Sequence, residues 1–333
     1  MKKILCILLL LVPLLLSGCG KLKDTDVIKE IKKKYEKSSG YQLKGELEIT
    51  NNDEVYSYDV LVDYMKDSFY KVSFVNQAND FQQIILKNND GVFLLTPSLN
   101  KSFKFQNNWP YSNSQIYLLD ALIQDIDDDE ELSFERKDDS FVLHTKVDYP
   151  NNRKLVKQTI IFDSDYNLKS VTVYDRNDVV CMSFIVSNIQ YSPKYEESYF
   201  ELDSIIEEKD NNEEEVKETS VIEDVVYPLL LPEGTKLVHE ERVSKDDGER
   251  VLMTYDGEKS FLLVEETLDV FHDFMVIPST GEPFQLMDTI GVMTDNSLSW
   301  SSGNIEYYLV SDVMSQDELI EVAQSIVGIN SFK

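Results

Sequence analysis

The sequence has few of the residues from which disulfide frameworks and metal sites are built. Only three cysteines and three histidines occur among its 333 residues. A disulfide-stapled scaffold is therefore excluded. A histidine-based metal site is not expected either, because His144, His239 and His272 have no second ligand at motif spacing. Cys181 lies in a strand-like stretch without a basic neighbour, which predicts an inert thiol.

Basic residues are also scarce. The chain has 32 Lys and Arg against 61 Asp and Glu, a net charge of −29 and a pI of about 4.4. Such a surface repels phosphate backbones, so nucleic-acid binding is excluded. It also repels anionic lipid unless another element holds the protein at a membrane. With 42% aliphatic and aromatic residues the composition is globular, and the length indicates about two domains.

A long apolar run stands at the N-terminus. It follows Lys2 and Lys3, covers residues 4–16 and ends at Ser17-Gly18-Cys19. A basic start, an apolar centre and small residues before a cysteine predict a bacterial lipoprotein signal peptide over 1–18, with lipidation of Cys19. The run is shorter than the roughly 20 residues that a transmembrane helix needs. An uncleaved anchor or a plain signal peptide is the alternative.

The segment behind this cysteine is basic. Between Cys19 and Lys37 the chain has seven lysines and four acids, and Val27, Ile31 and Tyr35 recur at four-residue spacing. We expect an anchor-proximal segment over 19–40 that contains an amphipathic helix. Its basic face is either solvated or attracted to anionic headgroups.

From residue 41 to residue 200 the pattern is strand after strand. Asn89-Asp90-Gly91 marks a hairpin, and later strands are predicted near 131–137, 140–149, 155–163, 167–174 and 179–190. One helix, predicted over 112–126 from the capping pattern Ser112–Gln115, interrupts them. About eleven antiparallel strands with one central helix predict an α+β fold, an unclosed antiparallel β-barrel with a helical lid.

The stretch 201–224 differs from what precedes it, with eleven acids against two lysines. Such a run repels itself and cannot form a core, so it is predicted to be a linker. Beyond it, 225–333 is predicted to form a small C-terminal α+β domain with six strands. Its last helix begins at the capping box Ser315–Glu318. This part has 6 basic and 20 acidic residues, so negative charge accumulates away from the lipid anchor.

Motifs for catalysis and metal binding are missing. The acidic cluster 125–131 fails as an EF-hand loop, because Glu130 and Arg136 stand where Gly and Glu are required. GxSxG, HExxH, Walker and GxGxxG patterns do not occur. We therefore expect no catalytic residues, no metal and no cofactor, and predict that the protein is not an enzyme.

Aromatic and aliphatic side chains along the predicted barrel are candidates for lining an apolar cavity. The alternative for each is an ordinary packed core. The candidates are Phe69, Phe74, Phe93, Leu95, Phe103, Phe105, Trp109, Tyr117 and Leu118.

The segments 83–93 and 95–105, followed by Trp109-Pro110 and preceded by the lipidation motif, carry a family resemblance. The chain resembles the Firmicutes sporulation-associated lipoproteins of the YdcC type, within the superfamily of outer-membrane lipoprotein carriers that includes LolA and the N-terminal domain of RseB/MucB. The resemblance covers residues 35–200, most specifically 83–126. The C-terminal part is similar to a domain of unknown function common in Firmicutes membrane and sporulation proteins.

The resemblance implies an unclosed barrel with a helical lid, whose apolar interior takes lipid acyl chains. Two features depart from the carriers. Cys19 would tether this protein, whereas the carriers are soluble shuttles, and none of the arginines falls in the position of the carriers' gating arginine. The resemblance therefore implies a fold and a cavity rather than a mechanism.

Together these patterns favour a membrane-anchored lipoprotein on the extracytoplasmic face of the cell membrane, active in envelope or sporulation processes. Its barrel would bind a lipid or the acyl chain of a lipoprotein. The alternative is a packed barrel that serves as a scaffold or regulator for a protein partner such as a cell-wall enzyme. A third possibility, a hydrolase, would need a cleft with a perturbed pair of carboxylates.

Overall fold

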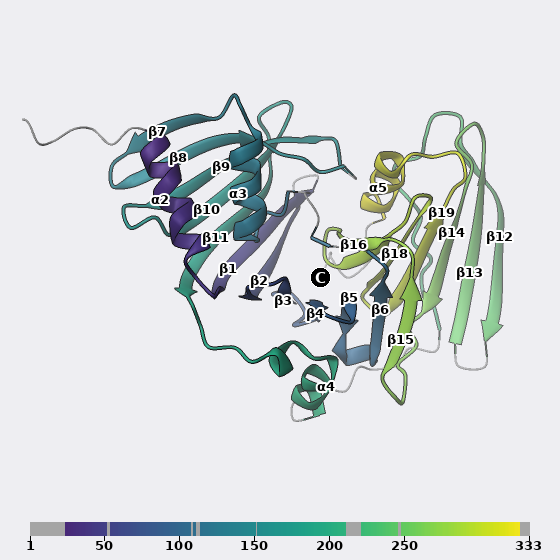
Figure 1. The fold of residues 1–333 in the computed structure, drawn as a ribbon. Helices are drawn as coiled ribbons and strands as arrows, with labels where there is room; N and C mark the ends of the chain where they lie inside the picture. Colours follow the sequence, from purple (N-terminus) through teal and green to yellow (C-terminus); the bar gives the residue numbers. More distant parts are fainter. Residues whose placement is uncertain are drawn as a thin grey trace, which may run out of the picture.

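The protein forms two β-sheets that lie side by side (Figure 1). The computed structural model describes residues 24–51, 54–107, 109–110, 114–150, 152–210, 221–245 and 248–326. The predicted signal peptide and Cys19 lie outside these residues. No helix in the described ranges is long and apolar enough to cross a bilayer.

The larger sheet has twelve strands, in the order β15-β6-β5-β4-β3-β2-β1-β11-β10-β9-β8-β7. Since β15 and β7 stand at its two ends, the sheet is open, as predicted. Its strands are β1 (Gly40–Asn51), β2 (Glu54–Met65), β3 (Phe69–Asn76), β4 (Gln82–Asn88), β5 (Gly91–Thr96), β6 (Lys101–Phe105), β7 (Ser133–Lys137), β8 (Ser140–Lys146), β9 (Leu155–Asp163), β10 (Leu168–Asp175), β11 (Val180–Tyr191) and β15 (Met275–Ser279).

Side-chain alternation explains most of these strands. In β1, Leu43, Leu47 and Ile49 are buried, whereas Lys44 and Glu46 between them are exposed. Each strand up to β6 pairs with the one before it, as does each strand from β8 to β11, and β1 pairs with β11. That pairing joins the two ends of the strand-rich region into one sheet, so the eleven strands predicted for 41–200 are found.

The twelfth strand corrects the predicted fold class, because it comes from the C-terminal part of the chain. β15 pairs in parallel with β6, with Ile277 opposite Phe103. Asn100 fixes the approach to this strand: its carbonyl accepts the Met275 N–H at 2.7 Å, and its side-chain amide donates to the Phe271 carbonyl at 2.6 Å. The range 225–333 therefore forms a sheet of its own and also extends the larger one.

The smaller sheet has seven strands, in the order β12-β13-β14-β19-β18-β17-β16. Helix α5 (Gln316–Gln324) packs on it, and the capping box between Ser315 and Glu318 is present as predicted. The strands are β12 (Lys236–Lys245), β13 (Gly248–Asp256), β14 (Phe261–Thr267), β16 (Glu282–Gln285), β17 (Ile290–Met293), β18 (Ser297–Ser302) and β19 (Ile305–Val310).

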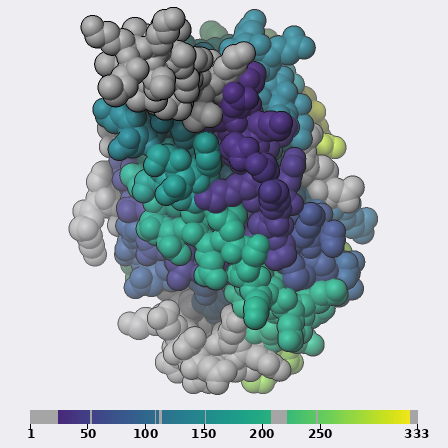
Figure 2. Space-filling view, turned by 60° about the vertical axis from the view of Figure 1, so that its left-hand side comes forward, coloured from purple at the N-terminus to yellow at the C-terminus, as the bar shows by residue number. Residues whose placement is uncertain are grey.

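Two helices, rather than the one predicted lid, cover one face of the larger sheet, called here the inner face. They are α2 (Asp24–Glu36) and α3 (Leu119–Asp128). Lys32 of α2 bonds to Asp127 of α3 at 2.6 Å, which joins the pair. Figure 2 shows the side on which the early described residues (purple), which include α2, adjoin segments from about residue 170 to 200 (green). The helix predicted from residue 112 begins at Leu119, and Ser112 lies outside the described residues.

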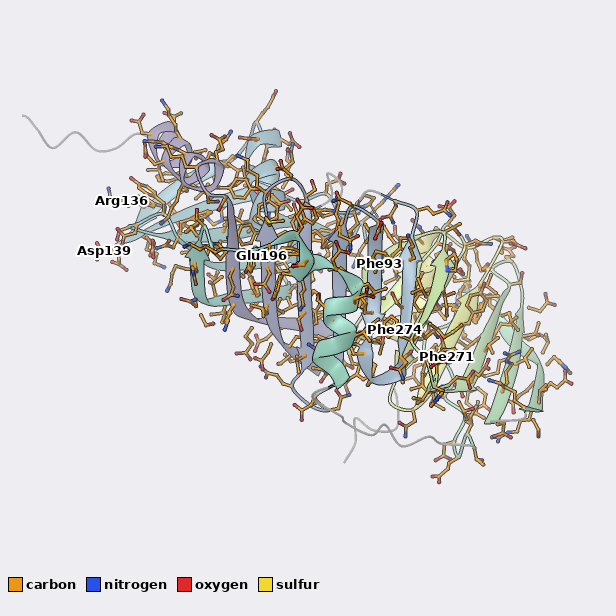
Figure 3. The ribbon with its side chains drawn as sticks, turned by 60° about the horizontal axis from the view of Figure 1, so that its bottom comes forward. Phe93, Arg136, Asp139, Glu196, Phe271 and Phe274 are labelled. Carbon is orange, nitrogen blue, oxygen red and sulfur yellow. The ribbon has the colours of Figure 1, made fainter. Side chains whose placement is uncertain are left out.

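The opposite, outer face of the larger sheet is partly covered by the start of the predicted linker. Residues 202–210 form helix α4 (Leu202–Asp210), and Ile205 packs with Phe200 on Phe69 and Phe93. Phe274 joins this cluster from the C-terminal part, and Figure 3 shows Phe93 and Phe274 beside α4. Apolar residues within an acidic run thus form an ordered contact, while residues 211–220 lie outside the described ranges.

This arrangement predicts that both halves unfold together. The two tryptophans report on different cores, since Trp109 lies in the core of the larger sheet and Trp300 in that of the smaller sheet. In each single-tryptophan variant, Trp300→Phe and Trp109→Phe, the urea midpoint from fluorescence should coincide with the midpoint from circular dichroism, because β15 belongs to one sheet and is linked to the other. Two midpoints separated by more than about 0.5 M would contradict the shared unit.

Candidate functional site

The nine predicted cavity residues lie on two different faces of the larger sheet. Six of them belong to or pack against the core of the inner face, namely Phe74, Phe103, Phe105, Trp109, Tyr117 and Leu118. Phe69, Phe93 and Leu95 lie on the outer face with Phe200. The split follows from alternation along the strand: Val92-Phe93-Leu94-Leu95 is apolar on both faces, so the sequence does not show which residue faces inward.

The inner face is filled by protein. Leu119, Leu122 and Ile126 of α3 and Val27 and Ile31 of α2 are buried against it. The C-terminal part contributes Ile290 and Val292 of β17 to the same core. Apolar side chains from three separate segments therefore occupy the space in which a ligand was expected.

A cavity of about 80 Å³ remains where β16 meets the inner face. Of the nine predicted residues, only Trp109 and Tyr117 line it. The other lining residues are Ile85, Gln115, Tyr149, Pro150, Asn152, Leu155, Met182, Glu282, Pro283, Phe284, Gln285 and Ile290.

Polar contacts fix the C-terminal part in this position. The side chain of Gln83 accepts the N–H of Ile290 at 2.6 Å and donates to its carbonyl at 2.8 Å. Tyr58 donates to the Met287 carbonyl at 2.7 Å, and Asn76 donates to the Asp288 carbonyl at 3.0 Å. Because these partners are buried backbone groups, removing either side leaves them without hydrogen bonds.

A buried carboxylate holds α3 to the sheet at its N-terminal end. Asp120 accepts hydrogen bonds from Tyr70 at 2.7 Å and from Tyr41 at 3.2 Å. Burial raises the pKa of Asp120 above its ordinary value, although the two tyrosines and the charge of Lys87 oppose the shift. Burial lowers the pKa of Lys87. The Asp120 carboxylate accepts hydrogen bonds that fix the position of the first turn of α3.

A second buried carboxylate lies further along α3. Asp125 accepts hydrogen bonds from Ser114 at 2.7 Å and from Gln158 at 2.6 Å. Burial raises its pKa to about 7, since no cation compensates for desolvation. The sequence assigns Asp125 only to the acidic cluster 125–131 at the end of the predicted helix. Its position three residues after Leu122 and one before Ile126, on the apolar side of the helix, was the signal for burial.

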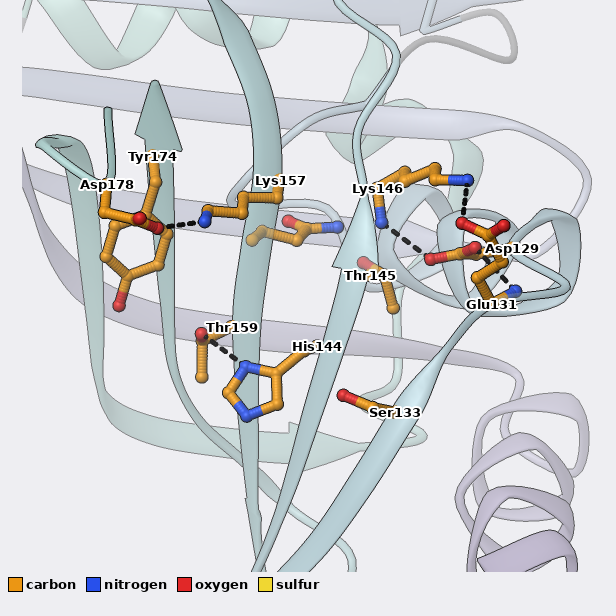
Figure 4. A pocket seen from close by; sticks show the side chains of 11 residues that line it. Asp129, Glu131, Ser133, His144, Thr145, Lys146, Lys157, Thr159, Tyr174 and Asp178 are labelled. Carbon is orange, nitrogen blue, oxygen red and sulfur yellow. Dashed lines mark hydrogen bonds and ion pairs between the residues drawn. The ribbon is translucent and has the colours of Figure 1, made fainter. Parts of the chain in front are cut away.

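A larger groove of about 490 Å³ lies over β7 to β10 and contains His144 (Figure 4). Both of its lysines are already paired: Lys146 with Glu131 at 2.6 Å, and Lys157 with Asp178. His144 shares a hydrogen bond with Thr159 at 2.9 Å. In the described part of the chain no group of three or more His, Cys, Asp and Glu could hold a metal ion.

Two further predictions concern the basic helix and the free thiol. Lys32, Lys33 and Lys34 of α2 all bond to protein groups, at 2.6–2.8 Å, so their charges are partly satisfied within the molecule. Cys181 is partly buried, and desolvation raises the pKa of its thiol. Since a raised pKa lowers the thiolate fraction, this agrees with an inert residue.

Fold and site together define a two-sheet β-rich protein whose inner face is closed by helices and by its own C-terminal part. Over 329 residues the chain is 36% identical to "Sporulation protein YdcC" of Bacillus subtilis (strain 168), covering 97% of this chain and 96% of that protein. The chain therefore belongs to the family of the sporulation protein YdcC, as its sequence motifs indicated. No family model matches it.

Solved structures show more distant likenesses. MucB in complex with MucA(peri) covers 91% of this chain and 98% of its own, with 13% identity and a TM-score of 0.33. The LolA superfamily protein NE2245 from Nitrosomonas europaea covers 55% of this chain and 99% of its own, with 12% identity and a TM-score of 0.33. At these values the likeness assigns neither ligand nor partner to this chain.

The contact between Tyr70 and Asp120 predicts a stability effect. Tyr70→Phe removes a donor from a buried carboxylate, so the free energy of unfolding should fall by about 1.5–3 kcal/mol in urea denaturation. Tyr227→Phe is the control, because the exposed Tyr227 hydroxyl bonds to Glu240 at the surface. Equal effects of the two variants would contradict the role of Asp120.

The raised pKa of Asp125 predicts a pH dependence. Protonation of Asp125 stabilises the folded state. This contribution is fully present below the unfolded pKa of 3.8 and is lost as the pH rises through about 7. The free energy of unfolding should therefore fall between pH 4 and pH 8, and Asp125→Asn should reduce the fall by about 2–4 kcal/mol. Burial also raises the pKa of Glu265 to about 7, so part of the fall with pH should remain in the Asp125→Asn variant. An unchanged slope in urea titrations would count against the buried carboxylate, with the exposed Asp139→Asn as control.

Proposed function

We propose that this protein is a non-catalytic, lipid-anchored protein of the cell envelope that acts in sporulation as a scaffold or regulator and binds a protein partner. The observation that carries the proposal is the filled inner face, with α3 and β17 packed directly on the sheet. Because the interior is packed, we propose that a partner binds at the surface of the protein.

The volume of the cavity at the inner face argues against a ligand there while the molecule is closed. Pockets that bury small ligands measure roughly 300–1,000 Å³, whereas the cavity beside Trp109 measures about 80 Å³. A cavity of this size has room for a few water molecules. An acyl chain would have to displace α3 or the segment around β16.

The N-terminal sequence supports the proposed place of the protein at the membrane. Lipidation of Cys19 would put the anchor five residues before α2, which begins at Asp24. The sporulation setting comes from the relative that bears that name. A diacyl anchor holds stably in a membrane, where a single chain does not, and this fits a fixed scaffold better than a shuttle.

A second candidate function is acyl-chain binding. The observation that favours it is the apolar and aromatic lining of the cavity, including Tyr117 and Phe284, at the boundary where the C-terminal part meets the sheet. If 282–292 moved away from the inner face, this cavity would enlarge into the apolar surface beneath. The hydrogen bonds of Gln83 to Ile290 hold it closed.

Native mass spectrometry of the delipidated chain, mixed with phospholipid at micromolar concentration, separates the two functions. We expect no acyl-bearing species for the wild type beyond the anchor itself, because the interior is filled. Gln83→Ala, which loosens the closure, is the comparison variant. Lipid bound to the wild type would contradict the scaffold proposal and favour a lipid carrier instead. Binding confined to Gln83→Ala would leave the closed molecule a scaffold.

A crosslinking experiment tests the proposal that the protein binds a protein partner. The wild-type full chain and its Gln83→Ala variant should both capture the same envelope protein from sporulating cells. Capture of no protein by either form, together with lipid binding, would overturn the proposal.

A further inference from the structure

Three consecutive leucines beside the smaller sheet are exposed to solvent. Leu229, Leu230 and Leu231 have exposed fractions of 80%, 50% and 37%. Single apolar side chains on a surface are ordinary, whereas a contiguous apolar patch marks a site of interaction. We call these three side chains the leucine patch.

The segment that carries the leucine patch is tied to both ends of helix α5. The Leu229 N–H donates to the carbonyl of Ser325, directly after the helix, at 3.1 Å. Further along the segment, the Thr235 hydroxyl donates to the carbonyl of Lys259 at 3.3 Å. The Lys259 ammonium donates in turn to the carbonyl of Val313, which precedes the helix, at 3.3 Å. The Val313 side chain is itself 50% exposed, so the apolar surface continues at this end.

The backbone around the leucine patch is fixed, so the leucines form an ordered surface. Pro228 and Thr235, on either side of it, are buried. The Leu230 carbonyl accepts a hydrogen bond from the Ser325 hydroxyl at 3.5 Å. A surface that is ordered before binding loses little conformational entropy when a partner binds. Since main-chain groups of Leu229 and Leu230 already bond within the molecule, the side chains are left for recognition.

Charges around the leucine patch are mainly negative. The segments 229–236, 256–260 and 311–318, which these hydrogen bonds bring together, contain six acids and two lysines. Four of the acids are exposed, namely Glu233, Asp256, Glu258 and Asp312. A surface of this charge attracts a basic partner segment and repels an acidic one.

The lysines around α5 do not reverse this charge. Lys259 is paired with Glu318 at 2.9 Å, and Lys154, which precedes β9, is paired with Glu321 at 3.0 Å. Lys236 is exposed, but the four exposed acids outnumber it. The surface beside the leucine patch is therefore acidic after its ion pairs are counted.

A second copy of this chain does not fit this surface. In a two-fold dimer the same patch of both copies would meet, so the exposed acids of one copy would face those of the other. Helix α2 is the basic element of the chain, but its Val27 and Ile31 are buried. Its lysines Lys32, Lys33 and Lys34 bond within the molecule. Because the acids repel anionic lipid as well, a different, basic protein chain is the favoured occupant.

Accordingly, we infer that the leucine patch is a docking surface for an amphipathic, basic helix of a partner protein. The apolar stripe of such a helix would cover the leucines, and the lysines or arginines beside the stripe would face Glu233, Glu258 and Asp312. A helix fits because it binds through its side chains, whereas an added strand needs free main-chain groups. The inference rests on the proposed function, for which it names the binding surface and the chemistry of the partner.

A labelled peptide of leucine and lysine, about 18 residues long so that it can form a helix, tests this on the full chain by fluorescence anisotropy. With its leucines at helical spacing the peptide should bind. A peptide of the same composition, with the leucines spread around the helix, should bind at least about tenfold more weakly, because it has no apolar stripe. A peptide with glutamate in place of lysine should not bind, because the acids beside the leucine patch repel it.

Two substitutions of similarly exposed apolar side chains locate the site. Leu230→Ser removes part of the leucine patch and should weaken binding of the helical peptide about fivefold to tenfold. Ile185→Ser is the control, because Ile185 of β11 is 56% exposed and Leu230 is 50% exposed. It should change the binding less than about twofold. Since both side chains are exposed, circular dichroism should show both variants to be folded.

Two charge reversals test the role of the acids. Glu233→Lys should weaken binding of the helical peptide about tenfold at low ionic strength. Asp139→Lys makes the same change in charge at an exposed site between β7 and β8, and should alter the binding less than about threefold. Equal effects of the two reversals would show attraction by the overall charge of the protein and would overturn the inference.

Other results would overturn the inference as well. These are no binding at millimolar peptide, equal effects of Leu230→Ser and Ile185→Ser, or a dimer in sedimentation that Leu230→Ser dissociates. A gain in binding on removal of residues 327–333 would make the chain's own C-terminus the occupant and would also overturn it. If Leu230→Ser still captured the envelope partner, the proposed function would stand with a different surface. If no partner were captured and lipid bound instead, the proposed function itself would fail.

Discussion

An apolar sheet face cannot be left in water, and the cover over the inner face of the larger sheet decides the rest of this structure. Each buried aliphatic or aromatic side chain there is worth about 1.5–3 kcal/mol, and the face carries many, including Leu43, Val62 and Phe184. Helices α2 and α3 cover part of it, and β17 covers more through Ile290 and Val292. The C-terminal part is thereby a component of this core as well as a unit with its own sheet.

Buried polar groups give the cover a fixed position. An apolar contact tolerates sliding, but the side-chain amide of Gln83 accepts from the Ile290 N–H through its oxygen and donates to the Ile290 carbonyl through its NH2. Asp120 accepts hydrogen bonds from two tyrosine hydroxyls at the first turn of α3. Shifting either element by one residue would leave these buried groups unpaired, at a cost of about 1–3 kcal/mol each. A cover fixed in this way leaves a small cavity and a closed interior.

Local patterns predicted much of the fold. Alternation located β7 to β11 to within two or three residues, and the capping box at Ser315 placed the start of α5 correctly. The missed features depend on contacts between distant residues. The short strand β15 pairs with β6 some 170 residues earlier, and the apolar run of β5 does not reveal which residues face the helices. The burial of Asp125 was missed because its acidic neighbours dominate the sequence around it, although its position in the helix shares a side with Leu122.

The closed inner face is tested most directly by hydrogen exchange on the full chain at neutral pH, resolved to single amides. The Ile290 amide, bonded to Gln83, and the amides of β4 should exchange at similar rates and should respond alike to low urea, because they belong to one cooperative core. Rapid exchange of Ile290 and its neighbours, while β4 remains protected, would show that the C-terminal part leaves the inner face and would contradict the account.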